Sequence, residues 1–143
     1  MAGSQDTGIG QASSACLFPL FRPGTRPESD AIKQAVDRSG HGFVSHDPRE
    51  SLSPDDPGEA WLELLVDGVT FDVLGLAPLQ SVCWPGLRHH FGIGENDITS
   101  CEAIVIGPGP HLSGAASAIP VVRAMMGMAE ALLEQIEGAV AVV

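Results

Sequence analysis

The chain has 143 residues, 44% of them hydrophobic, and its 18 acidic residues outnumber its 7 Lys and Arg residues to give a formal net charge of −11. A chain of this length can bury the hydrophobic core of one domain and is too short for two domains of typical size. Nucleic acids and anionic membranes attract proteins through Lys and Arg, so we expect neither as a partner.

The sequence shows no signal for export or membrane insertion. The first residues lack the basic segment and apolar run of a signal peptide, and no window reaches the roughly 18 uninterrupted apolar residues of a membrane-spanning helix. The chain has three cysteines, an odd number, and none of them forms a C-x-x-C pair: Cys16, Cys83 and Cys101. We expect buried free thiols and therefore a reducing, cytoplasmic location.

The N-terminal third predicts a tail followed by two strands with a helix between them. Small polar residues predict a disordered tail over 1–14, so that a single folded domain would span 15–143. The apolar run 15–21 predicts a strand, which Pro19 would place at a sheet edge or a bulge. A second short strand is expected over 42–46.

The helix between these strands has recognisable ends. Thr25 and Glu28 have the spacing of a capping box, and Gly40 is a suitable left-handed stop after the last turn. The helix would bury one narrow apolar stripe, formed by Ala31, Ile32, Ala35 and Val36. Beyond the second strand, residues 47–58 are rich in proline and acidic residues and predict a solvated loop.

The strongest local pattern is a β-hairpin over 61–74. Asp67-Gly68 lies between two β-rich runs and is a preferred pair for a type I′ turn. One face of the hairpin is then wholly apolar and belongs in the core, through the pairs Val66–Val69, Leu64–Phe71 and Leu62–Val73. On the opposite face Glu63 lies across from Asp72.

The C-terminal third predicts a strand, a loop rich in glycine and proline, a helix and a final strand. Apolar runs predict strands over 101–106 and 139–143. The helix between them would extend from an N-cap at Ser117 to Glu137. Residues 77–98 give no clear pattern.

Two β-α-β units around a hairpin predict an α+β fold. We expect a two-layer sandwich, in which one mixed and mostly antiparallel sheet carries both helices on one face. The nearest simple description is a ferredoxin-like arrangement with an added β-hairpin. Such an architecture does not by itself indicate a function.

Glu63 and Asp72 are the first candidates for chemistry. Like charges directly opposite on a sheet repel, so a retained pair could bind a cation or hold a shared proton at a raised pKa. The alternative, which the sequence favours, is a solvated face on which both side chains extend into water. No ligand spacing typical of a metal site is present, and we expect no metal and no cofactor.

The loop over 107–114 is the second candidate site, because ligands meet open sheets where a strand passes into a helix. Its possible ligand-binding residues are Gly107, Gly109, His111 and Ser113. His111 could act as an acid or base, with Glu63 or Asp72 as its partner. No phosphate-binding fingerprint and no G-x-S-x-G elbow is present, so the glycines and prolines can equally be read as shaping the loop alone.

The C-terminal helix has a wide apolar arc. Its polar residues fall on one narrow stripe, formed by Arg123, Glu130, Glu134 and Glu137. A sheet covers only one side of a helix, so the arc needs a second cover, which could be the 77–98 segment, a bound ligand or another subunit. We therefore expect a homodimer, with another protein as a further possible partner.

Two functions from different classes remain open. The first is a non-catalytic interaction or regulatory protein that self-associates through residues 117–143. The second is a small-molecule-binding protein or enzyme that uses the 107–114 loop, with His111 as acid or base. The sequence favours the first because no complete catalytic constellation can be found, and it leaves open whether the chain is an enzyme.

Overall fold

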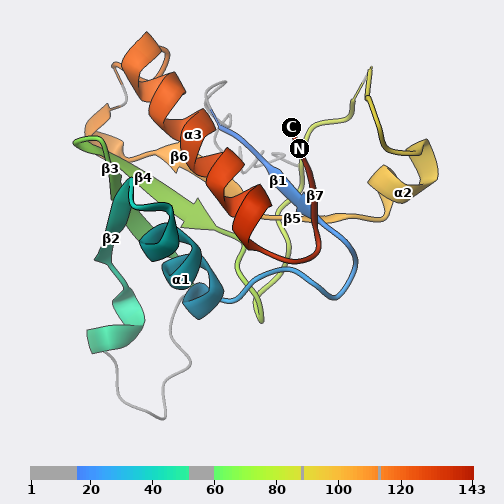
Figure 1. Ribbon diagram of the computed structural model, residues 1–143, viewed down its shortest axis with the longest axis horizontal. Helices are drawn as coiled ribbons and strands as arrows, with labels where there is room; N and C mark the ends of the chain where they lie inside the picture. The colour runs from blue at the N-terminus through green and yellow to red at the C-terminus, as the bar shows by residue number, and fades with distance from the viewer. Residues whose placement is uncertain (1–15, 52–59, 88, 113) are drawn as a thin grey trace, which may run out of the picture.

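The computed structural model describes residues 16–51, 60–87, 89–112 and 114–143, and it is an α+β structure (Figure 1). The predicted tail over 1–14 lies outside the described residues. The strands are β1 (Pro19–Phe21), β2 (Gly42–His46), β3 (Leu62–Val66), β4 (Val69–Leu74), β5 (Glu102–Ala103), β6 (Val105–Pro108) and β7 (Ala139–Val142). The α-helices are α1 (Ser29–Ser39), α2 (Glu95–Thr99) and α3 (Ile119–Gln135), and two short 3₁₀ helices are η1 (Pro48–Ser51) and η2 (Pro110–Leu112).

The strands form two sheets, so the prediction of a single sheet is wrong. One sheet has the order β5-β1-β7 and the other β2-β3-β4-β6, and all strand pairs within them are antiparallel. The predicted strand over 101–106 divides at Ile104, whose N–H donates to the Pro19 carbonyl, and its two halves join different sheets. Neither the ferredoxin-like arrangement nor the two-layer sandwich is confirmed.

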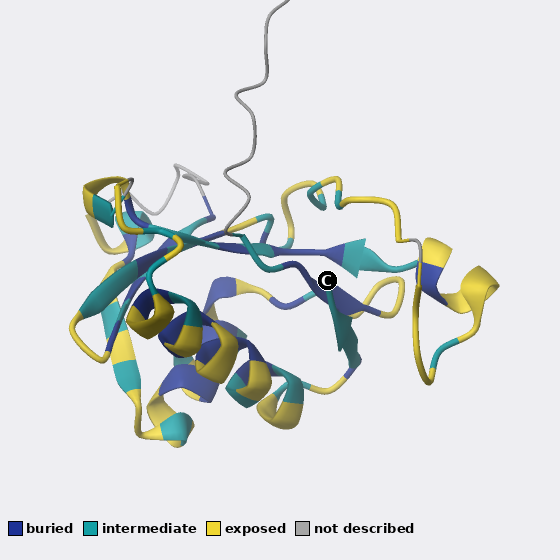
Figure 2. Ribbon diagram, turned by 90° about the horizontal axis from the view of Figure 1, so that it is seen from above, coloured by how far each residue is buried: buried dark blue, intermediate teal, exposed yellow. Residues whose placement is uncertain are grey.

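Helices α1 and α3 pack against each other and lie on the same side of the strands (Figure 2). The stripe predicted for α1 is largely confirmed, since Ile32, Ala35 and Val36 are buried. Helix α3 buries residues spaced three or four apart, as a helix packed on a sheet requires: Val121, Ala124, Met125, Met128, Ala129 and Leu132. These side chains share one core cluster with the inner faces of β3 and β4.

The predicted hairpin is confirmed residue by residue. Strands β3 and β4 pair with Leu62 opposite Val73, Leu64 opposite Phe71 and Glu63 opposite Asp72. The turn residues Asp67 and Gly68 have φ of 51° and 77°, as a type I′ turn requires. Burial alternates along β3, where Leu62, Leu64 and Val66 are buried and the residues between them are partly exposed.

The helix starts differ from those predicted. Helix α1 begins at Ser29 after an N-cap at Glu28, and the Thr25 hydroxyl donates instead to the Arg22 carbonyl at 2.7 Å, so no capping box forms. Helix α3 likewise begins after Ala118, with no side-chain cap from Ser117. The predicted stop at Gly40 is confirmed by its φ of 70°.

The segment over 77–98 has little regular structure and is held by polar contacts. The Arg26 guanidinium donates to the carbonyls of Gly75 and Leu79, and the Ala77 N–H donates to the Pro27 carbonyl at 3.0 Å. The prediction that all three thiols are buried is wrong, because Cys83, which lies in this segment, is exposed and Cys16 and Cys101 are only partly buried. All three cysteines are free, as predicted.

Candidate functional site

The outer face of the four-stranded sheet brings the predicted acidic pair into a row of polar and small residues. Glu63 on β3 lies opposite Asp72 on β4, and Asp72 lies opposite Gly107 on β6. The Ser45 hydroxyl donates to the Glu63 carboxylate at 2.7 Å, which supplies one partner for that charge. At the other end, a Cβ at Gly107 would lie 3.0 Å from the Cys16 sulfur, so glycine leaves room for that thiol.

Asp72 is the electrostatically unfavourable member of the row. Its pKa is raised, first by burial of the carboxylate and then by the negative charge of Glu63, while the charge of His111 opposes the shift. His111 lies in η2, directly beyond β6, and its side chain is exposed. The charge of His111 thus acts on Asp72 from beyond the end of β6, although no hydrogen bond joins His111 to either carboxylate in the described part of the chain.

Asp72→Asn is expected to stabilise the protein at pH 7 by about 0.2–1 kcal/mol, the usual size of a cross-strand charge effect. A raised pKa means that the folded state disfavours the carboxylate, so the stability penalty grows as the pH rises above the ordinary value of 3.8. Thermal melts should show a higher Tm for the variant at pH 7 and equal values below about pH 4. A variant that melts lower at pH 7 would show that the Asp72 charge is stabilising.

Residues 107–112 of the predicted loop continue directly from the sheet. The Gly109 N–H donates to the Thr70 carbonyl at 2.9 Å, and a Cβ at Gly109 would come within 2.7 Å of the Thr70 hydroxyl. The N–H of Leu112 donates to the Gly109 carbonyl, and the N–H of Ala115 donates to the Leu112 carbonyl. Gly109 therefore has a packing role against Thr70, as Gly107 has against the Cys16 sulfur. The remaining predicted residue, Ser113, lies outside the described residues.

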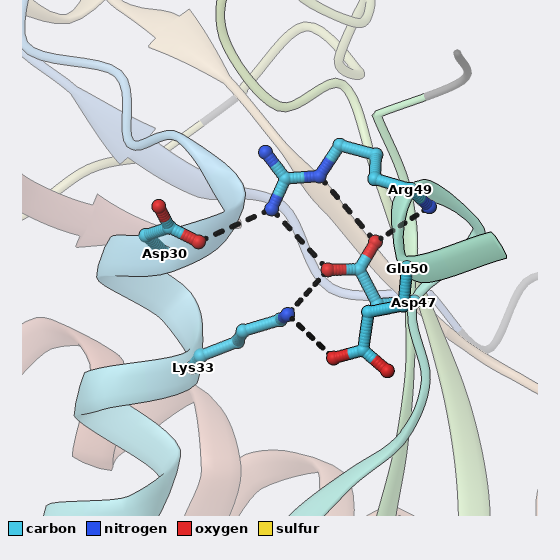
Figure 3. A network of polar contacts seen from close by, with 5 residues as sticks. All are labelled: Asp30, Lys33, Asp47, Arg49 and Glu50. Carbon is cyan, nitrogen blue, oxygen red and sulfur yellow. Dashed lines mark hydrogen bonds and ion pairs between the residues drawn. The ribbon is translucent and has the colours of Figure 1, made fainter. Parts of the chain in front are cut away.

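The sequence did not reveal the most strongly coupled charges of the structure (Figure 3). Asp47, predicted to lie in a solvated loop, is only 3% exposed and contacts Lys33 of α1 and Arg49 of η1. Arg49 also reaches Asp30, with 3.2 Å between nitrogen and oxygen. Lys33, the only lysine, reaches Glu50 at the same distance. This cluster fastens η1 to α1.

Hydrogen bonds decide the charge state of Asp47. Burial alone would raise its pKa, but hydrogen bonds from Arg49 and Lys33 outweigh burial and lower the pKa to about 2. Asp47 is therefore ionised throughout the physiological range. The sequence offered only part of this arrangement: Arg49 lies two residues after Asp47, but Lys33 is brought to the acid by a separate helix.

An apolar groove runs along α3 on the side that faces the end of β7. Its volume is about 960 Å³. It is lined mainly by apolar side chains, including Leu17, Ile119, Val122, Met126, Leu133, Val142 and Val143. Arg123, Gly127 and Glu130 also line it, and Ile119 and Met126 are 71% and 58% exposed. The wide apolar arc predicted for this helix therefore remains partly uncovered within the described chain.

The chain matches none of the protein-family models, curated proteins or solved structures with which it was compared. Over the described ranges, no helix combines the length and apolar character needed to cross a membrane. In the same ranges, no group of three or more His, Cys, Asp or Glu side chains is placed to hold a metal ion.

Proposed function

We propose that this chain is a non-catalytic interaction or regulatory protein that self-associates as a homodimer through residues 117–143. The observation that carries the proposal is the apolar groove along α3. Among the described residues, the other sides of α3 pack on the sheet and on α1, and this groove is the part of the helix that they leave uncovered. Apolar surface of this kind is stabilised by removal from water, at about 25 cal/mol per Å².

Charge and composition support proposals about the partners and the cellular location of this protein. The formal net charge of −11 opposes binding to nucleic acid and to anionic membranes, and we propose that neither is a partner. Three free thiols fit a reducing compartment, and we propose a cytoplasmic location. Self-association must overcome repulsion between two acidic copies, so a well-matched apolar contact is needed.

Met126→Glu is expected to abolish self-association, because it places a charge in the middle of the groove. Phe91→Glu is the matched control, since it adds the same charge at another large apolar side chain, one that is 96% exposed and does not line the groove. Light scattering should give the mass of one chain for the first variant and of a dimer for the second. Dissociation by Phe91→Glu but not by Met126→Glu would place the interface elsewhere.

A second candidate function is a small-molecule-binding protein or enzyme that uses the 107–114 loop. The observation that favours it is the raised pKa of Asp72 beside Glu63 and His111. In this proposal His111 serves as acid or base, with one of the two carboxylates as its partner.

A thermal-shift screen with metal ions, nucleotides and acyl compounds tests this second function. A ligand at one hundred times its Kd would add about 2.7 kcal/mol of stability. Stabilisation that His111→Ala removes would support the site. Stabilisation that survives His111→Ala, or none at all, would reject His111 as its centre.

A further inference from the structure

Gly127 occupies an energetically unfavourable position in α3 that packing among the described residues does not explain. A glycine inside a helix costs about 1 kcal/mol relative to alanine. A Cβ built at Gly127 would meet no atom within 4 Å, so no neighbour within the described chain requires a glycine there. It lies beside Met126, whose large apolar side chain is 58% exposed in the same groove.

Arg123 and Glu130 lie on the same side of this groove, one before and one after Gly127. They are seven residues apart, which places them about 10 Å from each other along the helix axis and on nearly the same face. Both are exposed, and neither forms an ion pair within the described ranges. The helix thus presents a positive charge and a negative charge on either side of a midpoint between Met126 and Gly127.

We propose that the partner of this surface is the α3 helix of a second copy, packed antiparallel about a two-fold axis between Met126 and Gly127. The inference rests on the proposed self-association and adds its geometry. An isologous contact repeats each interaction twice. Arg123 of each copy then lies level with Glu130 of the other, and each Met126 packs over the Gly127 opposite it. A parallel contact would instead place Arg123 against Arg123 and Glu130 against Glu130.

Two charge-reversal variants test this geometry when they are studied alone and mixed. Arg123→Glu places like charges together at both pairs of its own homodimer, and so does Glu130→Arg. Each is expected to raise the homodimer Kd roughly tenfold or more. In an equimolar mixture, one copy carries Arg123→Glu and the other Glu130→Arg. The two substituted positions then face each other with opposite charges, and the second pair keeps its native charges. The mixture should therefore form heterodimers with close to the wild-type Kd.

Sedimentation at about 0.15 M salt, where exposed charges more than about 8 Å apart are largely screened, gives the readout. A wild-type monomer would reject self-association itself. A wild-type dimer whose variants associate unchanged, or are not restored on mixing, would reject only the antiparallel pairing. A parallel contact would instead leave the Kd of both variant homodimers near that of wild type, because all three carry like pairs at both positions, and would make the mixture associate more tightly than wild type. Gly127→Ala provides a second measurement: the pairing predicts a higher Tm for the monomer together with weaker association.

Discussion

Leu64→Asp is expected to prevent folding. Leu64 is fully buried on the inner face of β3 opposite Phe71, where a carboxylate would have neither water nor a partner. Burying an unpaired charge costs about 4–5 kcal/mol or more, which approaches the whole stability of many domains of this size. Circular dichroism should show loss of the cooperative thermal transition.

Leu65→Asp is the control for this substitution. Leu65 is the next residue on the same strand, but it is only partly buried and lies on the outer face beside Thr70. The same chemical change should cost about 1 kcal/mol there and leave a cooperative transition. If Leu64→Asp melts normally while Leu65→Asp does not, the inner and outer faces of the hairpin have been assigned the wrong way round.

Asp47→Asn is expected to destabilise the protein by about 2–4 kcal/mol, because it leaves Lys33 and Arg49 around a buried group that no longer carries charge. Glu50→Gln is the control, since it removes one acid of the same cluster whose side chain is 73% exposed. That change should cost well under about 1 kcal/mol. Urea denaturation of the three proteins at pH 7 measures both differences. Equal effects of the two substitutions would show that burial does not strengthen the Asp47 contacts.

The stabilisation of the folded state by Asp47 should also disappear in acid. Its pKa is lowered from 3.8 to about 2 on folding, so ionised Asp47 stabilises the folded state above about pH 4 and that stabilisation is lost as the pH falls through about 2. The shift corresponds to about 2 kcal/mol. The stability difference between wild type and Asp47→Asn should therefore narrow between about pH 4 and pH 2. A difference that stays constant over this range would contradict the ionic origin of the stabilisation.

Local patterns predicted the elements of this fold well. The register of β3 and β4 follows from a two-residue turn and a side-chain period of two, both of which are local properties. The buried stripe of α1 and its end at Gly40 follow in the same way. The helix starts were predicted less well: α1 begins four residues after Thr25, because Pro27 disfavours the helical conformation at the residue before it.

The division into two sheets could not be read from the sequence. A continuous apolar run over 101–106 gives no sign that the chain changes sheet at Ile104, since that change depends on pairing with a strand more than eighty residues earlier. The burial of Asp47 is likewise non-local, because it requires Lys33 from α1. By contrast, the opposition of Glu63 and Asp72 follows directly from the hairpin register, and the placement of His111 near them follows from β6 pairing with β4.

The mass of the unmodified protein in solution tests the central claim most directly. Light scattering over a range from about 1 to 100 µM spans the affinities of ordinary homodimers. We expect a mass that rises with concentration toward twice the 14.9 kDa of one chain. A mass that stays at 14.9 kDa throughout would contradict self-association through α3 and leave the apolar groove without the partner proposed for it.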